Sequence, residues 1–532
     1  MIMRGIVGYT GFVGSNLLAR YKFDRFYNSK NFNEAVNMEF DELFFCGAPA
    51  VKWYANKHPE IDRETIDQII KVLDTIQVKR FILISTVDVY GDQYEMGDSD
   101  EDRAGNVSHA YGKNRYDLEE FIRRKFSNHH IVRLPALIGK GLKKNVVYDL
   151  LNNNQISVIS PNTQFQWYDL EWLYDDISRI IDSDLHTCNL VTEPLCTREI
   201  LTMFNYSSDS YKGTSTFSYD ITTKHGKIFG SSGKYIRDKE TVLNSIKKFI
   251  ETYNMSKDHL VVSNICLNHV SDFQFACILK LNGIKYVQIA PSRLINGWCD
   301  LSNFSPSVYT NNNVTPYSFQ SIAYSLDDLN IFSHKSALLL DHLKKVVDCA
   351  KLNNVKVLVF GCPKNRKISQ DCAENNKTFV EFFRKLGKYC ETSNVVICIE
   401  PNSKQYNCNY LNKISEVGVV VRDINNKNVR MMVDIGNALM EDDQIEDVYK
   451  FADIVHNIDV SQKNMCDFSE VSKVRQVHRH FSDILTNINY QHKINLEMKT
   501  IADSPSKELN LIRLSLDNFI ELYGKNTKSP IL

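Results

Sequence analysis

Three glycines near the start of the chain, Gly8, Gly11 and Gly14, have the spacing of a phosphate-binding turn. They follow an apolar pair (6–7) that predicts a strand and precede a segment (15–20) that predicts a helix. In such a turn the first glycine allows a tight bend, the second lets N–H groups approach a pyrophosphate, and the third lets helix and strand pack closely. An ordinary tight turn is the alternative interpretation, and the flanking strand and helix favour dinucleotide binding. The expected binding residues are Gly8, Thr10, Gly11, Phe12, Val13 and Gly14.

A second set of chemically capable residues lies far downstream, where carboxylates and one amide fall at or near the ends of apolar segments. These residues are Gln288, Glu400, Asp434, Asp459 and Glu497. Carboxylates that meet at one end of a barrel repel one another and raise one another's pKa values unless a cation lies among them. Their positions therefore predict a candidate site at the carboxyl ends of strands, which is where barrel enzymes carry their chemistry.

The elements that would position this second set repeat as a strand followed by a helical pattern. Eight such units in about 270 residues match the usual length of a TIM barrel, ~250 residues. We assign the barrel to residues 254–532. The predicted strands are Leu260–Asn264, Tyr286–Ala290, Tyr317–Ile322, Lys356–Phe360, Val395–Glu400, Arg430–Asp434, Ile454–Asp459 and Lys493–Glu497.

The glycine run belongs to an earlier series of alternating strands and helices, which is typical of a doubly wound parallel sheet. We assign this α/β domain, of Rossmann type, to residues 1–218. Residues 219–253 are expected to connect the two domains, because the sequence around 205–218 is rich in Ser, Thr and Tyr and loses its periodicity. A chain of 532 residues exceeds one ordinary core, which agrees with this division.

The composition disfavours some binding partners and locations of the protein. A formal net charge of −1 and the lack of a long basic run disfavour nucleic acid. No apolar stretch is long enough to span a bilayer, and the start of the chain reads as a strand rather than a signal peptide. The 13 cysteines are scattered without a CxxC pair, which predicts reduced thiols in a cytoplasmic protein.

Three further segments accompany the glycine run: 83–91, which contains Thr86, 111–115, and 133–135. Together they resemble the extended short-chain dehydrogenases/reductases, of the NAD-dependent nucleotide-sugar epimerase/dehydratase type, over about residues 3–205. The resemblance implies that Tyr111 is a catalytic acid/base and that Thr86 hydrogen-bonds the same substrate oxygen. A tyrosine needs a nearby cation to lower its pKa for this role. The family has a lysine where this chain has Arg115, which either supplies that charge and touches the ribose or leaves the site slow or inactive.

The resemblance also predicts how the cofactor is held. After the second strand the chain has Asn28, Ser29 and Lys30 instead of the acidic residue typical of an NAD enzyme, which favours NADP; a solvated loop lysine is the alternative interpretation. Gly47 and Ala48 are expected to pass beside the adenosine. The family's dehydratases carry Asp-Glu after the threonine, and here the pair 87–88 is Val-Asp, so reduction or epimerisation is favoured over dehydration.

The barrel segments 287–291, 359–366, 398–402, 432–437 and 495–499 resemble the xylose-isomerase-like sugar phosphate isomerases/epimerases. That resemblance implies a divalent metal held by Glu400, Asp434, Asp459 and Glu497, with the two glutamates moving a proton next to a carbonyl. The family usually has histidine where this chain has Asp459, and an acid where it has Gln288. An all-oxygen ligand set favours Mg²⁺ or Mn²⁺ over zinc.

Some residues keep two interpretations. Lys364 and Arg366 follow the fourth barrel strand and either clamp a phosphate or pyrophosphate or are surface charges. Trp167 and Tyr168 either line a sugar pocket or belong to the core. His480 is the histidine that a helix could bring to the metal site.

We interpret the chain as a bifunctional sugar-modifying enzyme for the synthesis of glycan precursors. The two resemblances also imply a homodimer as one oligomeric state, since dimers are common in both families. The first domain would oxidise, reduce or epimerise a sugar, nucleotide-linked by expectation, with NAD or NADP. The second would isomerise or epimerise a sugar with a metal. The alternatives are an active first domain joined to a sugar-binding barrel without activity, and a wholly non-catalytic nucleotide- or sugar-binding protein.

Overall fold

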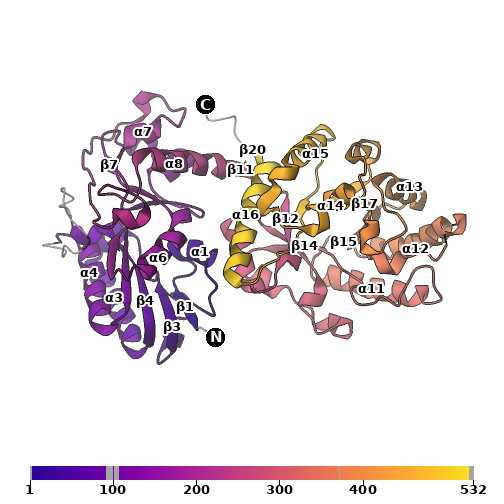
Figure 1. Cartoon of the computed structure of the whole chain (residues 1–532), viewed down its shortest axis with the longest axis horizontal. Coiled ribbons are helices and arrows are strands. Elements are labelled where there is room, and N and C mark those ends of the chain that lie inside the picture. Colours follow the sequence, from indigo (N-terminus) through magenta and orange to yellow (C-terminus); the bar gives the residue numbers. More distant parts are fainter. Residues whose placement is uncertain (1–2, 92–99, 101–106, 371, 527–532) are drawn as a thin grey trace. The chain divides into compact units, whose positions relative to one another are not determined.

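The computed structural model describes residues 3–91, 100, 107–370 and 372–526, and it divides the chain between Asn254 and Met255 into two compact units. Residues 219–253 lie in the first unit. Each unit has its own sheet (Figure 1). Among the described residues no helix is both long and apolar enough to cross a membrane. All 13 cysteines lie in the described part, and each has a free thiol.

The first unit is built on a six-stranded sheet in the order β2-β1-β3-β4-β5-β9, and all its strands run parallel. In Figure 1, α3 and α4 lie on one side of this sheet and α1 and α6 on the other. The elements are β1 (Arg4–Val7), α1 (Phe12–Leu18), β2 (Arg25–Tyr27), β3 (Glu39–Phe45), α2 (Lys52–Lys57), α3 (Pro59–Thr75), β4 (Gln77–Thr86), α4 (Ala110–Lys125), β5 (His129–Leu134), β6 (Ala136–Ile138), α5 (Val146–Asn152), β7 (Gln164–Phe165), β8 (Trp167–Asp169), α6 (Leu173–Asp182), β9 (Thr187–Asn189), β10 (Leu195–Cys196), α7 (Thr197–Leu201) and α8 (Lys239–Tyr253).

The strands of this unit are continuous apolar segments because the core contacts both faces of the sheet. Phe45 and Phe81 of the sheet pack with Ile66 of α3 and Leu118 of α4, and all four side chains are buried. Strands covered by helices on both faces need apolar side chains in both directions. The chain leaves β1 toward β2 and then crosses back to β3 on the other side of β1, so the order reverses between β1 and β3. Open α/β sheets bind ligands at the carboxyl ends of strands beside such a reversal.

The second unit is a closed barrel of eight parallel strands, β12 to β19, paired in chain order, with β19 joined to β12. All eight strands predicted from the sequence are confirmed, and no end is shifted by more than three residues. The elements are β11 (Met255–Ser256), β12 (Leu260–Ser263), α9 (Asp272–Leu281), β13 (Tyr286–Ile289), α10 (Ser307–Thr310), β14 (Thr315–Phe319), α11 (Ser336–Leu352), β15 (Val357–Phe360), α12 (Ala373–Glu391), β16 (Val396–Ile399), α13 (Ile414–Ile424), β17 (Val429–Asp434), α14 (Ile435–Met440), β18 (Val455–Val460), α15 (Arg475–Asn487), β19 (Ile494–Leu496), α16 (Pro505–Tyr523) and β20 (Lys525–Asn526).

Candidate active sites

Three of the predicted barrel carboxylates come together at the carboxyl ends of their strands. Asp434 is the last residue of β17, and Glu400 and Glu497 directly follow β16 and β19. One carboxylate oxygen of each lies within 4.8 Å of the others, and all three side chains are buried. Within the described residues this is the one such group of possible metal ligands. We call Glu400, Asp434 and Glu497 the carboxylate cluster.

Neighbouring polar groups orient the cluster. The Asn437 side-chain amide donates to Glu400 Oε1 and to Asp434 Oδ2, at 2.9 Å each. The Ser461 hydroxyl donates to Asp434 Oδ1 at 3.1 Å. Asn437 lies three residues after Asp434, where α14 begins, and its backbone N–H also bonds the Asp434 side chain as an N-cap. A single amide therefore fixes two of the three carboxylates.

Gly361 leaves the space that Glu400 occupies. It follows β15, and a Cβ atom at this position would overlap Glu400 Oε2 and lie 3.3 Å from Asn402 Oδ1. A residue with a side chain at 361 would therefore displace the Glu400 carboxylate.

The electrostatics of the cluster call for a cation. Burial raises the pKa of Asp434 to about 6. Burial first, and the neighbouring carboxylates second, raise the pKa values of Glu400 and Glu497 well above the usual range. A divalent ion would offset this cost, and three carboxylates suit Mg²⁺ or Mn²⁺. The donor set thus fits the predicted metal.

Asp459, the predicted fourth ligand, is not part of the cluster. It pairs in register with Asp434 on one neighbouring strand and with Asn495 on the other, and its carboxylate is held by side-chain amides instead. Its Oδ1 accepts from the Asn457 amide at 2.9 Å, and its Oδ2 from the Gln288 amide at 3.4 Å. Burial, and then the Asp434 charge, raise the pKa of Asp459 to about 7.

Gln288 and Asp459, the two departures from the family pattern, are thus hydrogen-bonded to each other. Asn495 completes the network by donating to Gln288 Oε1 at 3.0 Å. His480, by contrast, is an exposed residue that pairs with Glu446 at 2.8 Å, so the suggestion that it approaches the metal site is wrong.

The glycine run in the first unit forms the turn between β1 and α1. Gly8 has a backbone φ of +88°, a value that residues other than glycine rarely adopt. A Cβ atom at this position would also overlap the Cys46 carbonyl. A Cβ on Gly14 would overlap the Gly8 carbonyl, so the close approach of helix and strand depends on this glycine. Thr10 and Gly11 are exposed, and Phe12 and Val13 open α1.

The other predicted cofactor residues follow the two neighbouring strands. Asn28 follows β2 and builds a turn, because its side chain accepts from the Lys30 N–H at 2.8 Å. Ser29 and Lys30 are exposed in that turn. Gly47 and Ala48 follow β3 by two and three residues. The predicted residues therefore lie after β2, β1 and β3, on both sides of the reversal in strand order.

Tyr111 and Arg115 lie in the first turns of α4. Both are buried, and the Arg115 guanidinium carbon lies 4.1 Å from the centroid of the Tyr111 ring. Arg115 donates to the buried Asp62 carboxylate and to the Pro49 carbonyl in the loop after β3. Burial raises the pKa of Tyr111 to about 12, although the Arg115 charge opposes the rise. Sequence reasoning missed Asp62, which has no motif of its own.

Thr86 is the last residue of β4, and its hydroxyl donates to Asp88 Oδ2 at 3.3 Å. Lys52 pairs with Asp88 Oδ1 at 2.7 Å, and the Tyr219 hydroxyl donates to the same oxygen at 3.2 Å. Both Lys52 and Asp88 act on the pKa of Tyr111, with opposite signs. The region around Tyr111 therefore holds a Lys–Asp pair beside Thr86.

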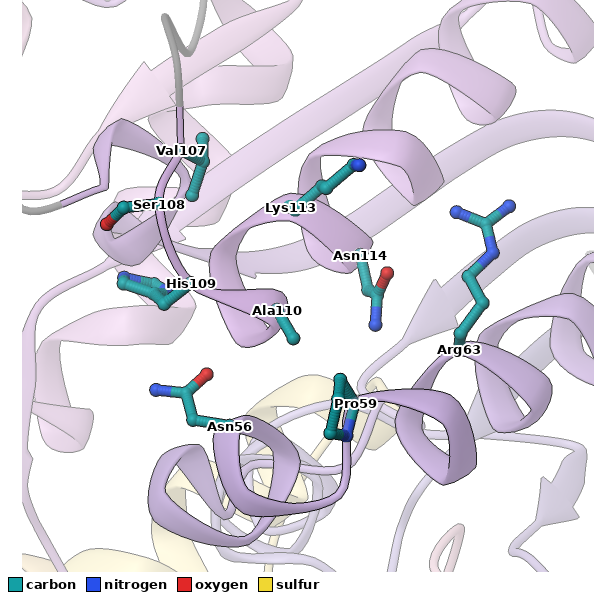
Figure 2. A pocket seen from close by; sticks show the side chains of 9 residues that line it. All are labelled: Asn56, Pro59, Arg63, Val107, Ser108, His109, Ala110, Lys113 and Asn114. Atoms are coloured by element: carbon teal, nitrogen blue, oxygen red, sulfur yellow. The ribbon is translucent and has the colours of Figure 1, made fainter.

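A cavity of about 790 Å³ adjoins the start of α4 (Figure 2). His109 and Ala110 line this cavity and directly precede Tyr111 in the chain. Neither Tyr111 nor the other predicted site residues are among the lining residues. Its basic side chains include Lys113 and Arg63, and Arg63 is already paired with two aspartates of α3 and α4.

Trp167 and Tyr168, the candidate sugar-stacking residues, are 1% and 0% exposed. The Tyr168 hydroxyl donates to the buried Asp176 at 2.8 Å. They are core residues.

Comparison with known proteins bears on the second unit. Residues 311–514 match the family model of the xylose isomerase-like TIM barrel, so the chain contains a domain of this kind. The match includes β14 to β19 and the whole carboxylate cluster. No curated protein matches the chain.

Solved structures similar to the chain include sugar epimerases and an endonuclease. D-psicose 3-epimerase, in the presence of D-fructose, is 14% identical over 50% of this chain and 100% of its own, with a TM-score of 0.42. Apo 3-keto-D-glucoside 4-epimerase from E. coli is 14% identical over 50% and 99%, with a TM-score of 0.40. An AP endonuclease of family 2 from Brucella melitensis is 14% identical over 50% and 100%, with a TM-score of 0.40.

Proposed function

We propose that the barrel is a metal-dependent sugar isomerase or epimerase. The observation that carries the proposal is the carboxylate cluster, buried at the carboxyl ends of three strands in a domain that matches the xylose isomerase-like family. Glu400, Asp434 and Glu497 would hold a divalent ion. Chemistry at this end of the strands is the rule for TIM barrels.

The reaction we propose is proton transfer at the carbon next to a sugar carbonyl. A bound divalent ion supplies polarisation of that carbonyl, which makes the neighbouring carbon more acidic. Glu400 and Glu497 are the groups that take up and return the proton. Burial raises the pKa values of both carboxyl groups, which makes each a stronger base than an exposed carboxylate.

For the first unit we propose NAD(P) binding and redox chemistry or epimerisation of a sugar, nucleotide-linked by expectation. The glycine turn, the loop 28–30 and the pair 47–48 flank the reversal in strand order, where open sheets bind nucleotides. Bound NAD(P) would supply hydride transfer. Tyr111 would exchange the proton of the sugar hydroxyl, with Thr86 donating to or accepting from the same oxygen.

A specific observation favours a second candidate, in which the first unit binds a nucleotide without turning over a sugar. The charge of Arg115 is engaged by Asp62, and Tyr111 keeps a pKa of about 12. A phenol of that pKa is a poor base near pH 7.

One set of measurements tests both halves. Native mass spectrometry and elemental analysis of the purified full chain should find NAD(P) and about one divalent ion per chain. In D₂O, the metal-loaded protein should exchange deuterium into a ketose next to its carbonyl, and Glu497→Gln should abolish this while Tyr111→Phe leaves it intact. Tyr111→Phe should instead abolish hydride exchange with a nucleotide-linked sugar. Protein that takes up no Mg²⁺ or Mn²⁺ would contradict the barrel proposal, and hydride exchange unaffected by Tyr111→Phe would contradict the proposal for the first unit.

A further inference from the structure

Arg366 is a completely buried charge that has no hydrogen-bond partner among the described residues. It ends the 3-10 turn Pro363–Arg366, which follows β15, and its side chain is 0% exposed. Its three guanidinium nitrogens are all shielded from solvent, and none has a hydrogen-bond partner among the described residues. Burial of a charge is unfavourable unless it is paired and hydrogen-bonded, so this guanidinium is available to pair with the anionic group of a ligand.

The other buried arginines show how the chain normally pairs such a group. Arg133 donates to Glu119 Oε2 at 2.6 Å and to the Tyr90 hydroxyl at 2.6 Å. Arg115 has Asp62. Arg366 differs from both, because no carboxylate or carbonyl in the described part of the chain takes its hydrogen bonds.

The turn that carries Arg366 is fixed. The side-chain amide of Asn365 donates to the carbonyls of Leu326 and Leu329, at 2.8 and 2.6 Å. Lys364 points elsewhere, since it is exposed and pairs with Asp327. Of the two basic residues noted in the sequence, only Arg366 is therefore held in the interior.

Arg366 also lies on the side of the barrel that carries the chemistry. Its turn follows β15 at the carboxyl end, as Gly361 does, and Gly361 borders Glu400. The positive charge of Arg366 acts on the Glu400 carboxylate, where it opposes the effect of burial on the pKa. A ligand that reached both groups would meet a cation next to the carboxylate cluster.

We propose that Arg366 binds an anionic group of the barrel's substrate, so that the substrate is an acidic sugar that carries a carboxylate or a phosphate. The planar guanidinium presents a fork of N–H groups that matches either anion with two parallel hydrogen bonds. This inference rests on the proposed sugar isomerase or epimerase function and adds the class of substrate to it.

The test is calorimetric binding to the metal-loaded full chain with three probes: D-fructose, D-glucuronate and D-fructose 6-phosphate. We expect one anionic probe to bind about 10- to 100-fold more tightly than fructose, as a charged hydrogen-bonded pair provides. The carboxylate and phosphate probes distinguish the two kinds of anion. Arg366→Met should remove this preference, and the control Lys364→Met should retain it. Equal binding of all three probes, or an anion preference that survives Arg366→Met, would overturn the inference.

Two further measurements keep the result decisive. Arg366→Lys keeps the positive charge but loses the forked N–H groups, so this variant should fold even where Arg366→Met does not. We expect it to lower the preference for the anionic probe by about fivefold or more. An unchanged preference in this variant counts against the inference. Metal content and deuterium exchange of fructose are measured on the same samples. Intact metal binding and exchange without an anion preference would reject the role of Arg366 alone, whereas protein that takes up no metal would reject the proposed function.

Discussion

The guanidinium of Arg115 stacks on the Tyr111 ring, 4.1 Å from its centroid, while the buried carboxylate of Asp62 holds that guanidinium in place. The cation that would lower the pKa of Tyr111 is therefore present, but burial outweighs it, and the Asp88 and Asp62 carboxylates add to the rise. This pair decides between a redox enzyme and a nucleotide-binding module, and its energetic role can be measured.

Arg115→Met should lower the free energy of unfolding of the first unit by about 3–5 kcal/mol, because Asp62 is left as an unpaired buried charge. The double variant Asp62→Asn/Arg115→Met should recover most of the loss, since the amide still accepts from Asn114. Urea unfolding followed by tryptophan fluorescence measures this, because three of the four tryptophans lie in this unit. As a control, Arg63→Met breaks an exposed pair and should change the free energy by no more than about 1 kcal/mol. A small effect of Arg115→Met would show that the Asp62 charge is not buried in solution.

Lys30→Ala should weaken the binding of NADP about tenfold and leave that of NAD unchanged, because only the 2′-phosphate offers a charge to this exposed lysine. Fluorescence titration with NADPH and NADH measures both affinities. Lys71→Ala, on the exposed surface of α3, should alter neither. An equal loss for both nucleotides would mean that Lys30 does not recognise the 2′-phosphate.

Gly361→Ala should reduce the affinity for Mn²⁺ about 10- to 100-fold, because the new methyl group displaces the Glu400 carboxylate from the cluster. Metal titration by electron paramagnetic resonance gives this affinity directly. Gly233→Ala serves as the matched control, since the nearest side-chain atom to its Cβ would be 3.8 Å away. Manganese binding that is identical in Gly361→Ala and the unmodified chain would argue against Glu400 as a ligand.

The second unit should lose stability in mild acid through His478, which is wholly buried on α15 with Nδ1 2.7 Å from the Tyr523 hydroxyl. Burial lowers the pKa of His478 to about 4 from the ordinary 6.5. The unfolded chain therefore binds the proton first, and the stability present above pH 6.5 is lost as the pH falls toward 4, by about 3 kcal/mol at most. Calorimetry at pH 7, 6 and 5 should show a shallower loss for His478→Gln. The exposed His480→Gln should follow the unmodified chain, and an unchanged slope in His478→Gln would assign the acid sensitivity to other groups.

The strands of the barrel could be predicted because each is a short apolar run bounded by polar residues. This pattern does not depend on which strands lie next to it in the barrel. The convergence of Glu400, Asp434 and Glu497 followed from their positions at strand ends. The exclusion of Asp459 from the cluster did not follow, because the alternation along a strand gives the face of a side chain and not its hydrogen-bond partners on other strands. The amides of Asn457 and Gln288 hold its carboxylate, and Gln288 lies 171 positions away in the sequence.

Ion pairs between residues far apart in the chain could not be predicted from the sequence either. Asp62 lies 53 positions from Arg115, and neither residue type nor spacing marks the pair. Similarly, the sequence offered Lys364 and Arg366 as equivalent basic residues, and only the three-dimensional packing separates an exposed lysine from a buried arginine.

The bond between Gln288 and Asp459 has a consequence for protein engineering. A designer who wished to restore a histidine at 459 would be changing one half of a joined pair, and the amide at 288 would lose its acceptor in the barrel interior. Both positions have to be exchanged in the same step, together with a check on Asn495, whose own amide depends on Gln288. The Gln288–Asp459–Asn495 network can therefore be exchanged only as a block of residues, never one position at a time.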